Sequence, residues 1–160
     1  MMRLLTLGAL IPLALTLSLT QARALSCMPA DPVAAFSVAN AAVETYIVVR
    51  GRFSGGPGPR EGGGAEPEPR RYTATFEGVT LSANGPLEPA EREVTIEETC
   101  AGPWCAELAM GEEVLTFLQI DTGGAPLLRV SPCYGSLFFQ PTEAQIEAIQ
   151  YCFEVGCTAS

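Results

Sequence analysis

Cysteine is the residue type with the most distinctive chemistry in this 160-residue chain. The chain contains six cysteines, which are Cys27, Cys100, Cys105, Cys133, Cys152 and Cys157. In an exported domain, an even number of cysteines indicates disulfide bonds, here three. Zinc binding is the alternative, but the Cys-x4-Cys spacing occurs twice without any histidine or Cys-x2-Cys pair. The cysteines therefore predict structural disulfides, and no metal or other cofactor is expected.

Few residues remain that could carry catalysis. Without histidine, no Ser-His or Cys-His nucleophile pair can form, and paired cysteines leave no thiolate. The acidic pairs Glu97-Glu98 and Glu112-Glu113 are the remaining candidates for hydrolysis. Adjacent residues of a strand point to opposite faces, so Glu97 and Glu98 cannot line one pocket, and Glu112-Glu113 is expected in a turn. We expect both pairs to be solvated surface and the protein not to be an enzyme.

Trp104 lies between Cys100 and Cys105 in the sequence. It is expected to pack in the core against a disulfide, and an exposed anchor for a partner or a saccharide is the alternative. Arg50 and Arg52 share one face of a predicted strand. We expect them to pair with glutamates of neighbouring strands rather than to form an anion site.

The N-terminus has the pattern of an export signal. A short basic start precedes an apolar run over residues 4–19, and Ala22-Arg23-Ala24 matches an Ala-x-Ala cleavage site. The apolar run is too short for a membrane anchor. Residues 1–24 are therefore predicted to be a signal peptide, and residues 25–160 a single domain without a transmembrane segment. Acylation of Cys27, as in a lipoprotein, is a minor alternative.

The charge and composition of the chain bear on its partners and on its source. After the predicted cleavage, 18 acidic residues and seven arginines remain (nine basic residues minus Arg3 and Arg23), so the net charge is 7 − 18 = −11. This charge disfavours nucleic acid and anionic membranes. Abundant Ala, Gly and Pro, with no lysine or histidine, is typical of a GC-rich bacterial genome. We expect a periplasmic or secreted monomer.

The periodicity after residue 25 predicts strands between two helices. Asp31-Pro32 predicts a short first helix, while Thr142-x-x-Gln145 is a capping box for a last helix that ends at Gly156. Alternating or continuous apolar residues predict strands over residues 46–53, 72–81, 93–97, 104–108, 114–120 and 127–130.

Two features interrupt this pattern. The apolar phase reverses after Gly78, which predicts a β-bulge there, and Gly51 predicts a bulge or close packing. Residues 54–70 hold six glycines and four prolines, which predicts a long mobile loop. A loop of this length inside a compact domain is either a solvated tether or a partner contact.

Four stretches of the chain together resemble a netrin-like domain, the OB-fold module of the tissue inhibitors of metalloproteinases. They are Cys27-Met28-Pro29 followed by Ala35-Phe36, the strand at 46–53, residues 115–118 followed by Cys133, and residues 145–157 ending in Gly156-Cys157. The resemblance implies a mainly β fold: an OB-fold-like antiparallel barrel of five to six strands, with a short N-terminal and a C-terminal helix, stapled by disulfides.

The resemblance also implies how the cysteines pair. By position, Cys27 would bond Cys133. In the inhibitors, cysteines stand where this chain has Leu25 and Ser37, so Cys105 and Cys157 lack their usual partners. We therefore infer two local bonds, which are Cys100–Cys105 across a turn and Cys152–Cys157 around the helix end.

The resemblance finally implies a protein-binding role, with an extracytoplasmic protease as one candidate partner. The candidate contact residues are Leu25, Ser26, Cys27, Met28, Pro29 and Trp104, next to the loop at 54–70. In the inhibitors a first-residue cysteine chelates the protease zinc, which here would require a mature chain that starts at Cys27. We predict an exported, non-catalytic protein-binding module. The alternative is a saccharide- or cell-envelope-binding OB module that uses aromatics such as Tyr72, Phe76 and Trp104.

Overall fold

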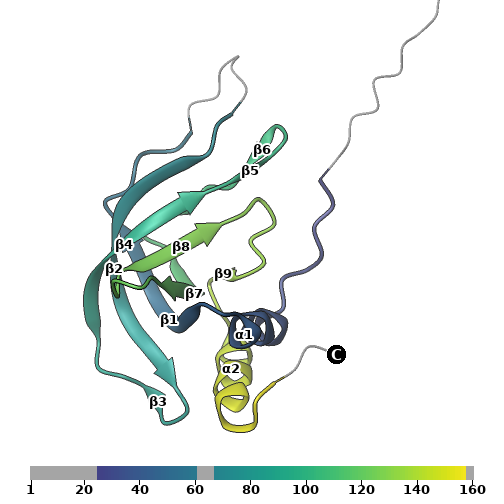
Figure 1. Cartoon of the computed structure of the whole chain (residues 1–160), viewed down its shortest axis with the longest axis vertical. Helices are drawn as coiled ribbons and strands as arrows, with labels where there is room; N and C mark the ends of the chain where they lie inside the picture. Colours follow the sequence, from purple (N-terminus) through teal and green to yellow (C-terminus); the bar gives the residue numbers. More distant parts are fainter. Residues whose placement is uncertain (1–24, 61–66, 158–160) are drawn as a thin grey trace, which may run out of the picture.

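The computed structural model describes residues 25–60 and 67–157, in which a closed barrel of five strands lies beside two helices (Figure 1). The barrel strands are β1 (Thr45–Ser54), β2 (Arg70–Ser82), β4 (Ala90–Glu98), β7 (Glu113–Ile120) and β8 (Pro126–Val130). The short strands are β3 (Gly85–Pro86), β5 (Cys100–Ala101), β6 (Trp104–Cys105) and β9 (Leu137–Phe139). The helices are α1 (Pro32–Ala41) and α2 (Glu143–Val155). The predicted signal peptide lies outside the described residues.

The strand order around the barrel is β1-β2-β4-β8-β7, and β7 pairs with β1 to close it. All barrel pairings are antiparallel except that of β4 with β8, which is parallel. Strand β9 extends the sheet beside β7. The predicted mainly β, OB-fold-like barrel of five to six strands is confirmed. The parallel pairing of β4 with β8 differs from the prediction, which had antiparallel pairs only.

Alternate residues of the strands fill the inside of the barrel. This cluster comprises the buried residues Val49, Phe53, Ala74, Phe76, Val94, Ile96, Ala106, Leu108, Val114, Leu118, Leu128, Val130 and Leu137. Gly51 of β1 lies directly opposite Gly78 of β2. A Cβ atom on Gly51 would overlap the backbone of Glu77 and Gly78 and the ring of Phe76. The close-packing interpretation of Gly51 is therefore confirmed.

A second cluster joins the outer face of the barrel to the two helices. Its buried members are Phe36, Val48, Leu81, Leu115, Phe117, Phe138, Ile146, Ile149 and Cys152. Val79 also packs against it. The predicted bulge at Gly78 is wrong, because β1 and β2 pair in unbroken register through this position. The apolar phase reverses there because Val79 and Leu81 point outward, toward the helices rather than into the barrel.

Both predicted helix starts are confirmed. The Asp31 side chain accepts a hydrogen bond from the Val33 amide at the start of α1. Thr142 and Gln145 form the reciprocal capping box of α2. Gly156 ends α2 with a φ of 70°, in the left-handed region that favours glycine.

Three disulfides join Cys27 to Cys133, Cys100 to Cys105 and Cys152 to Cys157. These are the pairs that the resemblance and the local spacing implied. The first bond ties the N-terminal segment to the chain after β8, across 106 residues of sequence. In the part of the chain that the structure describes, neither helix is long and apolar enough to cross a membrane.

The predicted strand at 104–108 is mostly wrong. Only Trp104 and Cys105 form a strand, which pairs with β5 in a small hairpin. Ala106 and Leu108 are buried in the barrel core without strand structure. The Leu108 amide instead donates to the side chain of Glu98, so a carboxylate replaces the neighbouring strand as its acceptor.

Candidate functional site

Three segments that are distant in sequence meet at one end of the barrel. They are the N-terminal segment, the described ends of the Gly/Pro-rich loop at 54–70, and the β5–β6 hairpin, which Figure 1 shows at the barrel end away from β3. Together with the chain after β8 they surround a depression of about 490 Å³. We call this surface the rim, and its residues are Leu25, Cys27, Arg60, Pro67, Pro103, Trp104, Cys105, Pro132 and Tyr134.

The rim gathers only part of the predicted contact set. Leu25, Cys27 and Trp104 line it. Ser26, Met28 and Pro29 instead line a separate groove beside α1. The N-terminal segment thus divides its side chains between two depressions.

The expectation that Trp104 packs in the core is wrong, because its exposed fraction is 42%. Strands β5 and β6 have two residues each, with Cys100 opposite Cys105 and Ala101 opposite Trp104. So short a hairpin offers no sheet face that could cover an indole ring. Trp104 is therefore an exposed aromatic side chain on a disulfide-closed hairpin, as the alternative of an exposed anchor for a partner or a saccharide requires.

Beneath the rim lies a buried carboxylate that sequence reasoning placed on the surface. The side chain of Glu98 is 0% exposed. Its Oε1 accepts from the Tyr72 hydroxyl at 2.7 Å and from the Leu108 amide at 2.9 Å. Its Oε2 accepts from Arg70 at 2.7 and 2.8 Å and from Arg60 at 3.1 Å. The expectation of a solvated Glu98 is wrong, because these donors replace water around the buried charge.

The electrostatics of this cluster favour the ionised carboxylate. Burial alone would raise the pKa of Glu98, but hydrogen bonds from the Leu108 amide, Tyr72 and Arg70 together lower it below its ordinary value. Burial raises the pKa of Tyr72, and the hydrogen bond that Tyr72 donates to Glu98 raises it further. Glu98 is therefore a fixed negative charge that holds its donors in place.

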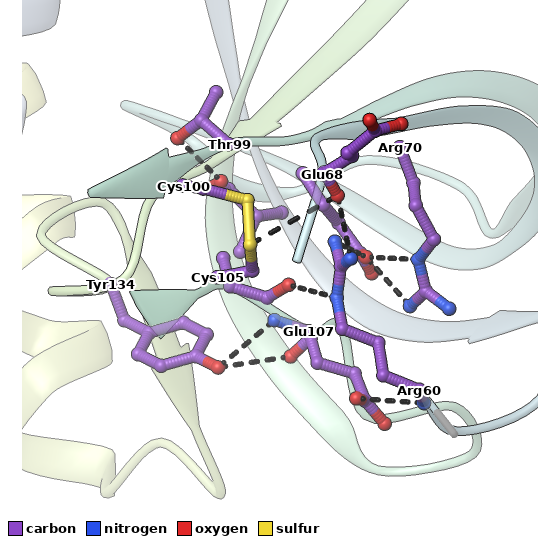
Figure 2. The surroundings of a disulfide bond; sticks show 11 residues. Arg60, Glu68, Arg70, Thr99, Cys100, Cys105, Glu107 and Tyr134 are labelled. Atoms are coloured by element: carbon purple, nitrogen blue, oxygen red, sulfur yellow. Dashed lines mark hydrogen bonds and ion pairs between the residues drawn. A yellow bond between two sulfur atoms is a disulfide. The ribbon is translucent and has the colours of Figure 1, made fainter. Parts of the chain in front are cut away.

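Arg60 connects the Gly/Pro-rich loop to this cluster. Its guanidinium donates to the Glu68 carbonyl at 2.7 Å, to the Ala106 carbonyl at 3.3 Å and to Glu98 at 3.1 Å. Its amide donates to the Glu107 carboxylate at 3.2 Å (Figure 2). Residues 61–66 lie outside the described residues. The described ends of the loop are therefore hydrogen-bonded to the barrel end.

Tyr134 fixes the remaining side of the rim. As Figure 2 shows, its hydroxyl accepts from the Glu107 amide and donates to the Glu107 carbonyl. Both hydrogen bonds are 3.1 Å long. Its ring meets Phe139 edge-on, with 5.6 Å between the ring centroids. The Tyr134 side of the rim is thus held by hydrogen bonds to Glu107 and by packing against Phe139.

The other acidic candidates lie apart from the rim cluster. Glu97 points to the outer face of β4, where it pairs with Arg71 and Arg129, so its predicted separation from Glu98 is confirmed. Glu112 is exposed in the turn before β7, but the turn prediction is wrong for Glu113, which begins β7. Glu113 pairs with Arg50 at 2.7 Å, as expected for that arginine. Over residues 25–60 and 67–157, no group of three or more acidic or cysteine side chains could hold a metal ion.

The aromatics named for saccharide binding do not share an exposed face. Phe76 is 1% exposed inside the barrel, and the Tyr72 hydroxyl is occupied by Glu98. One sequence signal could have revealed the buried cluster. Val94, Ile96 and Glu98 follow one strand phase, which places the Glu98 side chain inside the barrel.

Comparisons with protein-family models, with curated proteins and with solved structures gave no match to this chain. Its function is therefore inferred from its own residues and from the geometry described above.

Proposed function

We propose that the chain is an exported, non-catalytic protein-binding module of netrin-like type, which contacts its partner through the rim. The observation that carries this proposal is the meeting of the N-terminal segment, the Gly/Pro-rich loop and the β5–β6 hairpin around one depression with an exposed tryptophan. Tryptophan is among the residues most often dominant in binding energy at protein interfaces. Leu25, 38% exposed, adds an apolar side chain to the same surface.

The anchoring of the rim supports binding rather than simple solvation. The Cys27–Cys133 bond holds the N-terminal segment, the Cys100–Cys105 bond closes the hairpin, and Arg60 with Glu98 holds the loop. A surface that is fixed before contact loses less conformational entropy when a partner binds. This preorganisation is of direct use to a binding module.

The netrin-like resemblance suggests the class of partner. In the tissue inhibitors of metalloproteinases, the N-terminal segment and the first inter-strand loop form the edge that enters the protease. The corresponding segments of this chain adjoin at the rim, so an extracytoplasmic protease is the first partner to test. Zinc chelation would require Cys27 as the first residue, whereas cleavage after Ala24 leaves two residues before it.

The intact mass of the exported protein tests that point. We expect a chain that starts at Leu25 and is six hydrogens lighter than its reduced form, because all six cysteines are paired. A start at Cys27 would restore zinc chelation, and an added lipid mass would indicate a lipoprotein anchor instead.

The proposal itself is tested by site-specific photo-crosslinking followed by affinity measurement. A photoreactive phenylalanine replaces Trp104 in the exported protein, and Val43, which is fully exposed and does not line the rim, carries it in the control. We expect a protein adduct from position 104 alone. The purified partner should then bind the Trp104→Ala variant at least about tenfold more weakly than the native protein, with Val43→Ala unchanged.

Three outcomes would decide against this function. Identical adducts from both positions, or a partner affinity that Trp104→Ala leaves unchanged, would remove the rim as the contact surface. Glycan binding that depends on Trp104, without any protein adduct, would select the saccharide-binding alternative. A panel of serine, cysteine and metalloproteases, assayed with the native protein and Trp104→Ala, shows whether binding also inhibits.

A further inference from the structure

A second and larger depression lies between the N-terminal segment, α1 and the outer face of β7 and β8. Its volume is about 770 Å³, within the range of small-molecule sites. We call it the α1 groove. Phe117 and Leu127 contribute from the strands, and Ala34 and Val38 contribute from α1. The small side chain of Ala34 leaves open the space that a larger residue would fill.

The walls of the α1 groove contain apolar side chains that are unusually exposed. Met28, in the N-terminal segment, is 86% exposed, and Val38 of α1 is 71% exposed. Each contributes apolar surface that a ligand could cover, at about 25 cal/mol per Å² removed from water. The groove therefore suits an apolar ligand, but apolar surface alone does not say which one.

Charge at the strand side of the α1 groove indicates which kind of head group the ligand would carry. Glu97 is a single carboxylate that pairs with two guanidinium groups, those of Arg71 and Arg129. This cluster therefore carries one excess positive charge, although the chain as a whole is acidic. Arg129 also donates to Gln119 at 2.9 Å, and both residues line the groove. The strand side thus presents cationic and amide donors.

The other side of the α1 groove has the opposite sign. Asp31 lines it there and is held by its hydrogen bond from the Val33 amide. An anionic group would be repelled by Asp31 and attracted by Arg129, so the two residues give the groove a direction. A cationic head group would have the reverse preference and would meet the excess charge around Arg129 unfavourably.

We propose that the α1 groove binds an acyl-chain carboxylate, with the apolar chain along Ala34, Val38 and Phe117 and the carboxylate at Arg129. This site is separate from the rim and does not depend on the proposed function. The acyl chain of the ligand supplies affinity by covering the exposed apolar wall of the groove, and Arg129 orients the ligand by binding its carboxylate.

Calorimetric titration of the oxidised protein with dodecanoate, below its critical micelle concentration, tests the proposal. We expect saturable binding that strengthens by up to about fourfold for each added methylene until the chain outgrows the groove. Dodecanol should bind more weakly than dodecanoate, and dodecyltrimethylammonium more weakly still. Equal or tighter binding of the ammonium compound would overturn the assignment of the head group.

Two variants with matched controls locate the ligand. Ala34→Trp fills the groove and should weaken dodecanoate binding at least about tenfold, whereas Val43→Trp adds the same residue on an exposed site outside it. Arg129→Gln should weaken binding about two- to fivefold. Arg71→Gln makes the same change in net charge but does not line the groove, so it should have a smaller effect.

All four variants should keep the native fold, so their affinities for dodecanoate can be compared directly. Ala34 is not a member of either buried core cluster, and Arg71 and Arg129 form exposed ion pairs, so native circular dichroism is expected in all four variants. Absence of saturable binding, or equal affinity in Ala34→Trp and Val43→Trp, overturns the site. Equal affinity in Arg129→Gln and Arg71→Gln overturns the role of Arg129.

Discussion

Replacing Glu98 by glutamine should destabilise the fold far more than the same change at its neighbour Glu97. The Glu98 carboxylate is fully buried and accepts hydrogen bonds from two arginines, a tyrosine and a backbone amide. Glutamine keeps one acceptor oxygen, so its NH₂ group must face donors on one side of the cluster. Removing one partner of a buried ion pair costs about 3–5 kcal/mol, and we expect Glu98→Gln to fall in that range.

The matched control is Glu97→Gln, on the outer face of the same strand. Its partners Arg71 and Arg129 are 67% and 58% exposed. Exposed ion pairs contribute about 0–1 kcal/mol each, so we expect a small loss. Urea unfolding of the disulfide-intact proteins, followed by far-ultraviolet circular dichroism, gives the free energies of unfolding. A Glu98→Gln variant within about 1 kcal/mol of the native protein, where a buried-pair loss of about 3–5 kcal/mol is expected, would refute this account of the cluster.

The same cluster makes a prediction about pH. The pKa of Glu98 in the folded protein is lowered from its ordinary value of 4.5. A lowered folded-state pKa contributes stability above the unfolded pKa, and this contribution is lost as pH falls through the folded pKa. The stability difference between the native protein and Glu98→Gln should therefore be constant near neutral pH and narrow below about pH 4.5. A difference that widens on acidification would contradict the lowered pKa.

Further predictions concern packing and the disulfides. Gly51→Ala should destabilise the protein by about 1–3 kcal/mol, because the added methyl group overlaps the backbone of the opposite strand; a neutral change in thermal unfolding would refute the close approach. Replacing both Cys27 and Cys133 by serine should cost about 5 kcal/mol, against about 2 kcal/mol for Cys152 and Cys157, since the first bond closes a loop of 106 residues and the second one of 5. Equal losses in denaturant unfolding would show that loop length does not set their contribution.

The sequence predicts well those features that depend on near neighbours. Asp31 and Thr142 mark helix starts because their side chains accept from amides two or three residues along the chain. Alternation in β4 predicts a strand because Val94 and Ile96 line the barrel with every second residue. The local disulfide at the end of α2 follows from five-residue spacing around a helix end.

Features that depend on which surfaces meet in the fold were harder to predict. The apolar phase of β2 reverses because the outer face of one half lies under the helices, and a sequence pattern does not distinguish this from a bulge. Arg70 meets Glu98 because β2 pairs with β4, and Arg60 reaches Glu98 from the loop that precedes β2. Their charges therefore read as solvated when each is considered in its own segment. Trp104 was misjudged because its strand ends after two residues.

The N-terminal segment links the two proposed binding surfaces and also allows them to be separated by experiment. Cys27 lines both the rim and the α1 groove, so its bond to Cys133 fixes a wall of each. Loss of that bond should weaken binding at both places and cannot assign a ligand to either. Trp104 lines only the rim and Ala34 only the groove. If Trp104→Ala weakens only the binding of the protein partner and Ala34→Trp weakens only the binding of dodecanoate, the two sites are independent. If each variant weakens the binding of both ligands, one surface serves both.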